Sequence, residues 1–164
     1  MPAEIPTGWE ARCTRLWEEF PTVGPVDFRR EIAELVHELP EGHPVGLFEW
    51  ASACDATDLE AEAVRHYRAA LAGGLGGERR RQAVIQLAST LRNLGEASES
   101  VRLLTEEKGN GQDQLDDAVD AFLALALIDL GREREAAALA LGALARHLPQ
   151  YGGAVARYAR DVRR

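Results

Sequence analysis

The stretch VGLFEWASACDATDLEAEAVRHYRAAL, residues 45–71, aligns with two later stretches of the chain: QAVIQLASTLRNLGEASESVRLLTEE at residues 82–107 and AVDAFLALALIDLGREREAAALALGAL at residues 118–144. A small residue follows a large apolar one at the same place in each stretch, at successive spacings of 37 and 36 residues. These pairs are Trp50-Ala51, Leu87-Ala88 and Leu123-Ala124. A repeat of this period predicts an array of similar units that bury their apolar faces on one another.

Two further sets of positions recur at the same spacings. A turn residue stands at Asp58, Gly95 and Gly131, and a small residue follows at Ala63, Ser100 and Ala136. The turn residue must tolerate the backbone of a helix C-terminus, and small residues let two antiparallel helices approach closely. Each unit is therefore predicted to be a pair of helices joined by a tight turn.

The composition agrees with an all-α fold. Ala and Leu make up 48 of the 164 residues, whereas Val, Ile and Thr make up only 20, and this bias favours helix over sheet. The formal net charge of −8 argues against a nucleic-acid binder, because phosphate binding depends on Lys and Arg.

The sequence also indicates the cellular setting. No secretory signal is recognisable at the N-terminus, and no stretch reaches the roughly 20 apolar residues that would cross a membrane. Cys13 and Cys54 lie in amphipathic helical patterns, so buried free thiols in a reducing compartment are expected. A cytoplasmic protein without a membrane partner is predicted.

The segment before the repeats carries an aromatic stripe. Trp9, Cys13, Leu16, Trp17 and Phe20 follow helical spacing on one face. This stripe must be buried, and two interpretations are open: the helix caps the first repeat of its own chain, or it docks on a second subunit, where Trp is enriched. The chain is accordingly divided into N-terminal amphipathic helices (1–44), three repeats (45–149) and a C-terminal capping helix (150–164).

At the repeated positions the chain resembles tetratricopeptide repeats. That family has a large and then a small residue in the first helix, a Gly-like turn, and a small, an aromatic and a small residue in the second helix. The first copy supplies Ala63, Tyr67 and Ala70, the second has Glu107 in place of the last small residue, and the third lacks the aromatic. The stretch ERRRQAVIQLASTLRNLG at residues 78–95 looks most like the small bacterial subfamily called group 5.

The resemblance implies three helix pairs in a short right-handed α-solenoid, and a non-catalytic adaptor or scaffold that binds a protein or peptide. Its first helices are expected to line a concave face, where amides and hydroxyls can bond a peptide. The expected partner-binding residues are Gln82, Gln86, Ser89, Arg92, Asn93, Ser52, Asp55 and Phe122, with Glu49, Leu125 and Asp129 extending the surface. A solvated helix face and a polar dimer contact are the alternative interpretations of the same polar stripe.

Self-association is the first alternative function. Trp9, Trp17 and Phe20 place three large aromatic side chains on one short stripe. Residues 1–44 carry nine acids and four arginines, whereas the last helix is rich in Arg, so the two ends are complementary in sign. At least one member of the resembled subfamily is thought to dimerise. A homodimer is therefore predicted, with the N-terminal helices contributing and the groove occupied by the partner subunit.

A small anion or ligand binder is the second alternative. Arg79, Arg80 and Arg81 follow a glycine-rich turn at the start of a helix, where an anion can bind, and Arg92 lies further along. The phosphate-loop ending is missing, so an inter-repeat turn with solvated arginines is the main interpretation. No zinc-like His/Cys spacing and no nucleophile motif occurs, so no catalytic residue, metal or cofactor is predicted and the chain is not expected to be an enzyme.

Overall fold

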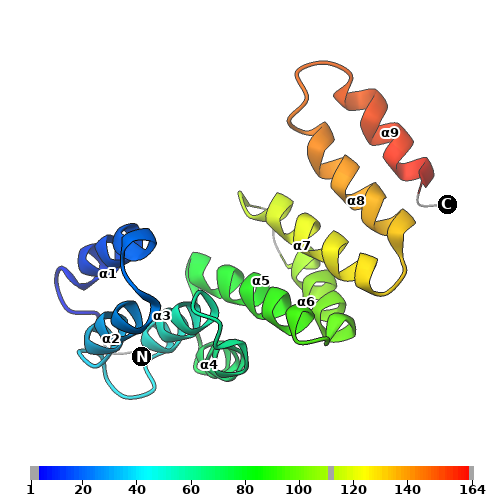
Figure 1. Cartoon of the computed structure of the whole chain (residues 1–164). Coiled ribbons are helices and arrows are strands. Elements are labelled where there is room, and N and C mark those ends of the chain that lie inside the picture. Colours follow the sequence, from blue (N-terminus) through cyan, green and yellow to red (C-terminus); the bar gives the residue numbers. More distant parts are fainter. Residues whose placement is uncertain (1–3, 111–112, 163–164) are drawn as a thin grey trace. The chain divides into compact units, whose positions relative to one another are not determined.

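The structure is a computed structural model that describes residues 4–110 and 113–162. The described residues form α-helices and one short 3-10 helix, arranged in chain order as Figure 1 shows. The elements are α1 (Trp9–Glu19), η1 (Phe20–Thr22), α2 (Pro25–Val36), α3 (Pro44–Asp55), α4 (Glu60–Ala72), α5 (Gly77–Asn93), α6 (Ala97–Gly109), α7 (Asp116–Asp129), α8 (Glu133–Ala145) and α9 (Gly152–Val162). The prediction of an all-α chain of helix pairs is confirmed.

The chain divides into two compact units, residues 1–83 and residues 84–164. The boundary falls inside α5, so the N-terminal helices share a unit with the first repeat, and α6 to α9 belong to the other unit. The boundaries inferred from the repeats, after residues 44 and 149, follow sequence periodicity rather than compactness and stay a prediction.

The turn in each helix pair has the same backbone conformation at the position that the sequence singled out. The φ angle is +62° at Asp58, +87° at Gly95 and +69° at Gly131. Glycine adopts this left-handed conformation without a steric penalty, and Asp is one of the few other residues that tolerate it. The next N–H donates back to the carbonyl five residues earlier, which ends the helix. These bonds run from Leu59 to Cys54, from Glu96 to Leu91 and from Arg132 to Leu127.

The aromatic stripe of α1 is buried within its own unit. Trp9 is fully enclosed, packs with Cys13, Leu35 and Leu39, and donates its indole N–H to the Leu35 carbonyl oxygen over 2.8 Å. The remainder of the stripe packs against α2 in a second cluster of Trp17, Phe20 and Phe28, with ring centroids 4.6 to 6.0 Å apart. Trp9 therefore offers no surface to a second subunit, whereas Trp17 and Phe20 remain half-buried.

The second unit has a core to which α5, α6, α7 and α8 contribute. The small residues Ala88, Ala124 and Ala136, which recur in the sequence alignment, are all buried in this core. Larger side chains fill the space between them. The core consists of Ile85, Ala88, Leu104, Val119, Leu123, Ala124, Leu127 and Ala136.

Replacing Ala88 by Phe tests this packing. The Ala88 side chain is fully buried among Leu104, Val119 and Leu123, so a large ring must displace its neighbours. The free energy of unfolding of the second unit is expected to fall by about 1–3 kcal/mol, measured by urea unfolding followed by circular dichroism. Replacement of the exposed Ala121 by Phe is the matched control, and equal stability of the two variants would contradict the repeat alignment.

Both cysteines are free and buried, as predicted. Burial raises the pKa of the Cys54 thiol to about 11, and burial together with the nearby charge of Glu49 raises the pKa of Cys13 well above its usual range. Neither thiol therefore has the thiolate character of a reactive cysteine. None of the helices within the described ranges has the length and apolar character needed to cross a membrane.

Candidate functional site

The predicted polar stripe of α5 is present in the second unit. The opposite side of the helix is closed, because Val84, Leu87, Ala88 and Leu91 are all buried. Three of the predicted partner-binding residues, Gln86, Ser89 and Arg92, are half-buried, and the fourth, Asn93, is exposed. This segment of α5 therefore offers a partly accessible row of amide, hydroxyl and guanidinium groups.

An ion pair joins this row to α7. The Nε of Arg92 lies 2.6 Å from Oδ2 of Asp129, and about a third of each of these side chains is exposed to solvent. On α7, Leu125 is 41% exposed and Ile128 is 49% exposed, whereas Phe122 packs partly into the core. The α5–α7 face, as we call the surface of Gln86, Ser89, Arg92, Asn93, Phe122, Leu125, Ile128 and Asp129, thus combines polar groups with exposed aliphatic ones.

The other three predicted partner-binding residues fall in the first unit, on α3 and at the start of α5. Ser52 is buried, and its Oγ accepts a hydrogen bond from the Tyr67 hydroxyl over 3.3 Å. Asp55 is half-buried at the end of α3, and Gln82 donates to Glu78 Oε1 over 3.2 Å. The expectation that Ser52 faces a partner needs correction. Ser52 lies between α3 and α4, where its hydroxyl is bonded to Tyr67.

Glu49 also differs from the expectation that it extends the polar surface. It is buried, and its two carboxylate oxygens accept from the Trp17 indole N–H over 2.9 Å and from Arg79 Nε over 3.1 Å. Arg79 continues outward to Glu10, with contacts of 3.0 and 2.6 Å. Hydrogen bonds to Glu10 and the charge of Glu49 raise the pKa of Arg79.

The arginines after the glycine-rich turn are therefore not the solvated side chains expected from the sequence. Arg79 joins α1, α3 and α5 through its two carboxylate partners, and Arg81 is buried. Arg80 is half-buried. Because Arg79 is already neutralised by two carboxylates, this cluster gives little support to the anion-binding alternative.

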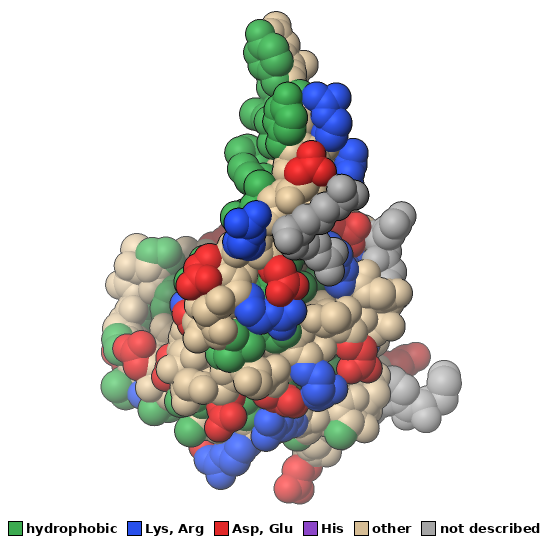
Figure 2. Space-filling view, turned by 90° about the vertical axis from the view of Figure 1, so that its right-hand side faces the viewer, with side chains coloured by type: hydrophobic (Ala, Val, Ile, Leu, Met, Phe, Trp, Pro, Cys, Tyr) green, Lys and Arg blue, Asp and Glu red, His purple; other side chains and the backbone are tan. Residues whose placement is uncertain are grey.

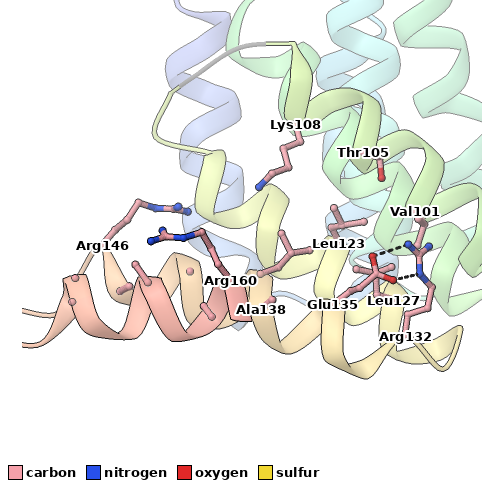
Figure 3. Close-up of a pocket in the computed structure, with 17 residues that line it drawn as sticks. Val101, Thr105, Lys108, Leu123, Leu127, Arg132, Glu135, Ala138, Arg146 and Arg160 are labelled. Carbon is pink, nitrogen blue, oxygen red and sulfur yellow. Dashed lines mark hydrogen bonds and ion pairs between the residues drawn. The ribbon is translucent and has the colours of Figure 1, made fainter. Parts of the chain in front are cut away.

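A cavity in the second unit was missed by the sequence reasoning. It has a volume of about 780 Å³ and is lined by residues of α6, α7, α8 and α9, together with Arg132 just before α8 and Arg146 just after it (Figure 3). No sequence motif marks this place, since its lining is largely Ala, Gly and Leu at positions spread over about 60 residues. No group of three or more His, Cys, Asp or Glu suited to a metal ion occurs within residues 4–110 and 113–162.

Comparison with known proteins gives one match. A family model described as a tetratrico peptide repeat, of the group 5 kind, matches residues 44–162. No curated protein and no solved structure matches the chain. The family match begins at the first residue of α3 and ends at the last of α9, so it covers every helix pair with the recurrent turn. This chain therefore belongs to the tetratricopeptide repeat family, group 5.

Proposed function

We propose that the protein is a small adaptor or scaffold that binds another polypeptide without catalysis. Tetratricopeptide repeat proteins are generally interaction modules. The observation that supports this proposal most directly is the α5–α7 face, where Leu125 and Ile128 remain exposed beside the Arg92–Asp129 ion pair. Exposed aliphatic side chains adjoining polar groups are typical of protein-binding surfaces.

The polar groups of this face suit a polypeptide partner. A glutamine or asparagine amide offers both donors and an acceptor, so Gln86 and Asn93 can pair with peptide N–H and C=O groups. Arg92 can bind a carboxylate in a bidentate manner while it remains beside Asp129. The aliphatic pair on α7 would bury one or two apolar side chains of the partner.

Replacement of Gln86, Ser89, Arg92 and Asn93 together by Ala tests the proposed surface. The quadruple variant is expected to keep the helical circular-dichroism spectrum, since the buried side of α5 is untouched, and to lose the proteins that the parent chain captures from its host extract. The readout is quantitative mass spectrometry of proteins retained on immobilised parent and variant.

The matched control replaces an exposed charged cluster elsewhere in the second unit. Arg102 pairs with Glu99 and Glu106 on the outer side of α6, so a variant with all three changed to Ala removes three polar side chains away from the α5–α7 face. It is expected to capture the same proteins as the parent. Equal capture by the quadruple variant would remove the α5–α7 face from the binding site.

Self-association is retained as a second candidate because of an apolar edge on the α8–α9 hairpin. Leu144 is 50%, Tyr151 78% and Tyr158 59% exposed. At the top of the view in Figure 2, hydrophobic side chains run along one edge of the hairpin. The prediction that Trp9, Trp17 and Phe20 form the contact is untested, and the hairpin edge offers more exposed apolar surface than the enclosed Trp9.

A further inference from the structure

The cavity of the second unit has an apolar floor. Leu123 and Leu127 of α7 and Leu139 of α8 contribute to it together with Val101 of α6. The walls from α8 and α9 present small residues, so the cavity reaches the helix backbones there. These small lining residues are Ala138, Gly142, Ala145, Gly152, Gly153, Ala156 and Ala159. A volume of about 780 Å³ is in the range of sites that hold small organic ligands.

Positive side chains converge at one end of the cavity. Figure 3 shows the nitrogen ends of Lys108, Arg146 and Arg160 turned to the same side of the pocket, away from the Arg132–Glu135 pair at the other end. The buried carboxylate of Asp120 pairs with both Lys108 and Arg146: its Oδ1 contacts Lys108 and its Oδ2 contacts Arg146. Arg146 also pairs with Asp117, which lies outside the lining.

The charges at this end do not cancel. Lys108, Arg146 and Arg160 bring three positive charges, whereas Asp117 and Asp120 bring two negative ones. Arg160 forms no ion pair with a carboxylate in the part of the chain that the structure describes. One positive charge therefore remains at the end of an apolar cavity, and a ligand with one negative charge would balance it.

We propose that this cavity binds an aliphatic carboxylate, with the carboxylate at Arg160 and Arg146 and the hydrocarbon chain along Leu123, Leu127 and Leu139. A carboxylate can accept paired hydrogen bonds from a guanidinium group. The floor offers few hydrogen-bonding groups beyond the Thr105 hydroxyl, so it suits a chain with no polar atoms better than an extended peptide, whose backbone groups would lose water without replacement.

Calorimetric titration of the full-length protein with decanoate, below its micelle-forming concentration, tests the proposal. Saturable binding of one decanoate per chain is expected, with a dissociation constant below about 1 mM. Each buried methylene contributes roughly a fourfold gain in affinity, so octanoate, which has two fewer, is expected to bind about fifteenfold more weakly. Decanol, which has the chain but not the charge, is also expected to bind about tenfold more weakly than decanoate.

Two substitutions locate the binding. A Cβ on Gly142 would meet no atom within 4 Å, so Gly142→Leu can be accommodated by the backbone while its side chain fills the cavity. This variant is expected to fold and to lose decanoate binding, whereas Gly142→Ala keeps it. Arg160→Gln is expected to weaken decanoate about tenfold and leave decanol unchanged. Its control is Arg157→Gln, because Arg157 lies over the Tyr158 ring outside the cavity lining.

Three results would overturn the proposal. Parent protein that gives no saturable heat with decanoate up to about 1 mM excludes the ligand class. Unchanged binding in a folded Gly142→Leu variant places the ligand elsewhere. If light scattering shows that the parent is a dimer and that Gly142→Leu is a monomer, the cavity is occupied by a second copy of the chain instead. None of these outcomes depends on the α5–α7 face, so the proposed polypeptide binding is tested separately.

Discussion

Replacing Glu49 by Ala is expected to lower the free energy of unfolding of the first unit by about 3–5 kcal/mol. The Glu49 side chain is only 6% exposed, and it accepts hydrogen bonds from Trp17 and Arg79. Its removal leaves the partly buried indole N–H of Trp17 and Nε of Arg79 without their acceptor, and a donor that is shielded from water loses solvation without compensation.

Unfolding in urea followed by tryptophan fluorescence measures this effect. All the tryptophans of the chain, Trp9, Trp17 and Trp50, belong to the first unit, so the signal reports on that unit alone. Glu10→Ala is the matched control, because Glu10 pairs with the same Arg79 but half of its side chain is exposed. This control is expected to cost at most about 1 kcal/mol. A Glu49→Ala variant as stable as Glu10→Ala would show that the buried pair contributes nothing beyond a surface contact.

The sequence was most informative where short-range geometry determines the structure. A left-handed backbone at a helix end needs Gly or one of a few polar residues, so Asp58, Gly95 and Gly131 could be recognised as turns from their spacing alone. Small residues at a helix crossing were equally recognisable, and Ala51, Ala63 and Ala88 are all fully buried. Both signals depend on residues within one helix pair.

Long-range pairing was not recoverable in the same way. Glu49 and Arg79 are 30 residues apart. The sequence pattern around each shows that a polar residue stands on a helix, but it does not distinguish a solvent-exposed side chain from one in a buried ion pair. Nothing in the local sequence identifies the partner of a carboxylate on an apolar helix face or of an arginine at the start of another helix. The sequence therefore placed Glu49 on a binding surface and Arg79 in solvent, and the structure corrects both.

The cavity was invisible for a different reason. The α8 sequence EREAAALALGALA has apolar residues on every side, so periodicity cannot say which side is packed. Ala140 stands where the family has an aromatic residue, and it is exposed. The side of α8 that carries Ala138, Gly142 and Ala145 lines the cavity instead. Without a large side chain to fill this space, the third repeat leaves a hollow that only the three-dimensional structure reveals.

Replacing Trp9 by Ala is expected to destabilise the first unit by about 3–5 kcal/mol, because the largest side chain of its core is lost and a cavity is left. The Leu35 carbonyl also loses its indole donor. Trp9→Phe keeps most of the volume and loses the hydrogen bond, so a smaller decrease of about 1–3 kcal/mol is expected. Urea unfolding followed by the fluorescence of Trp17 and Trp50 measures both variants.

The same variant separates the two interpretations of the N-terminal helix. If α1 caps its own unit, Trp9→Ala lowers stability but leaves the molar mass from light scattering unchanged in the absence of urea, whatever the oligomeric state. If α1 docks on a second subunit, the stability of the parent depends on protein concentration, and the variant lowers the molar mass and removes that dependence. Since Trp9 has no exposed surface and bonds within its own unit, the first outcome is expected. Replacing Tyr151 and Tyr158 by Ser is the companion test, because a contact between hairpin edges would be lost there while the first unit stays intact.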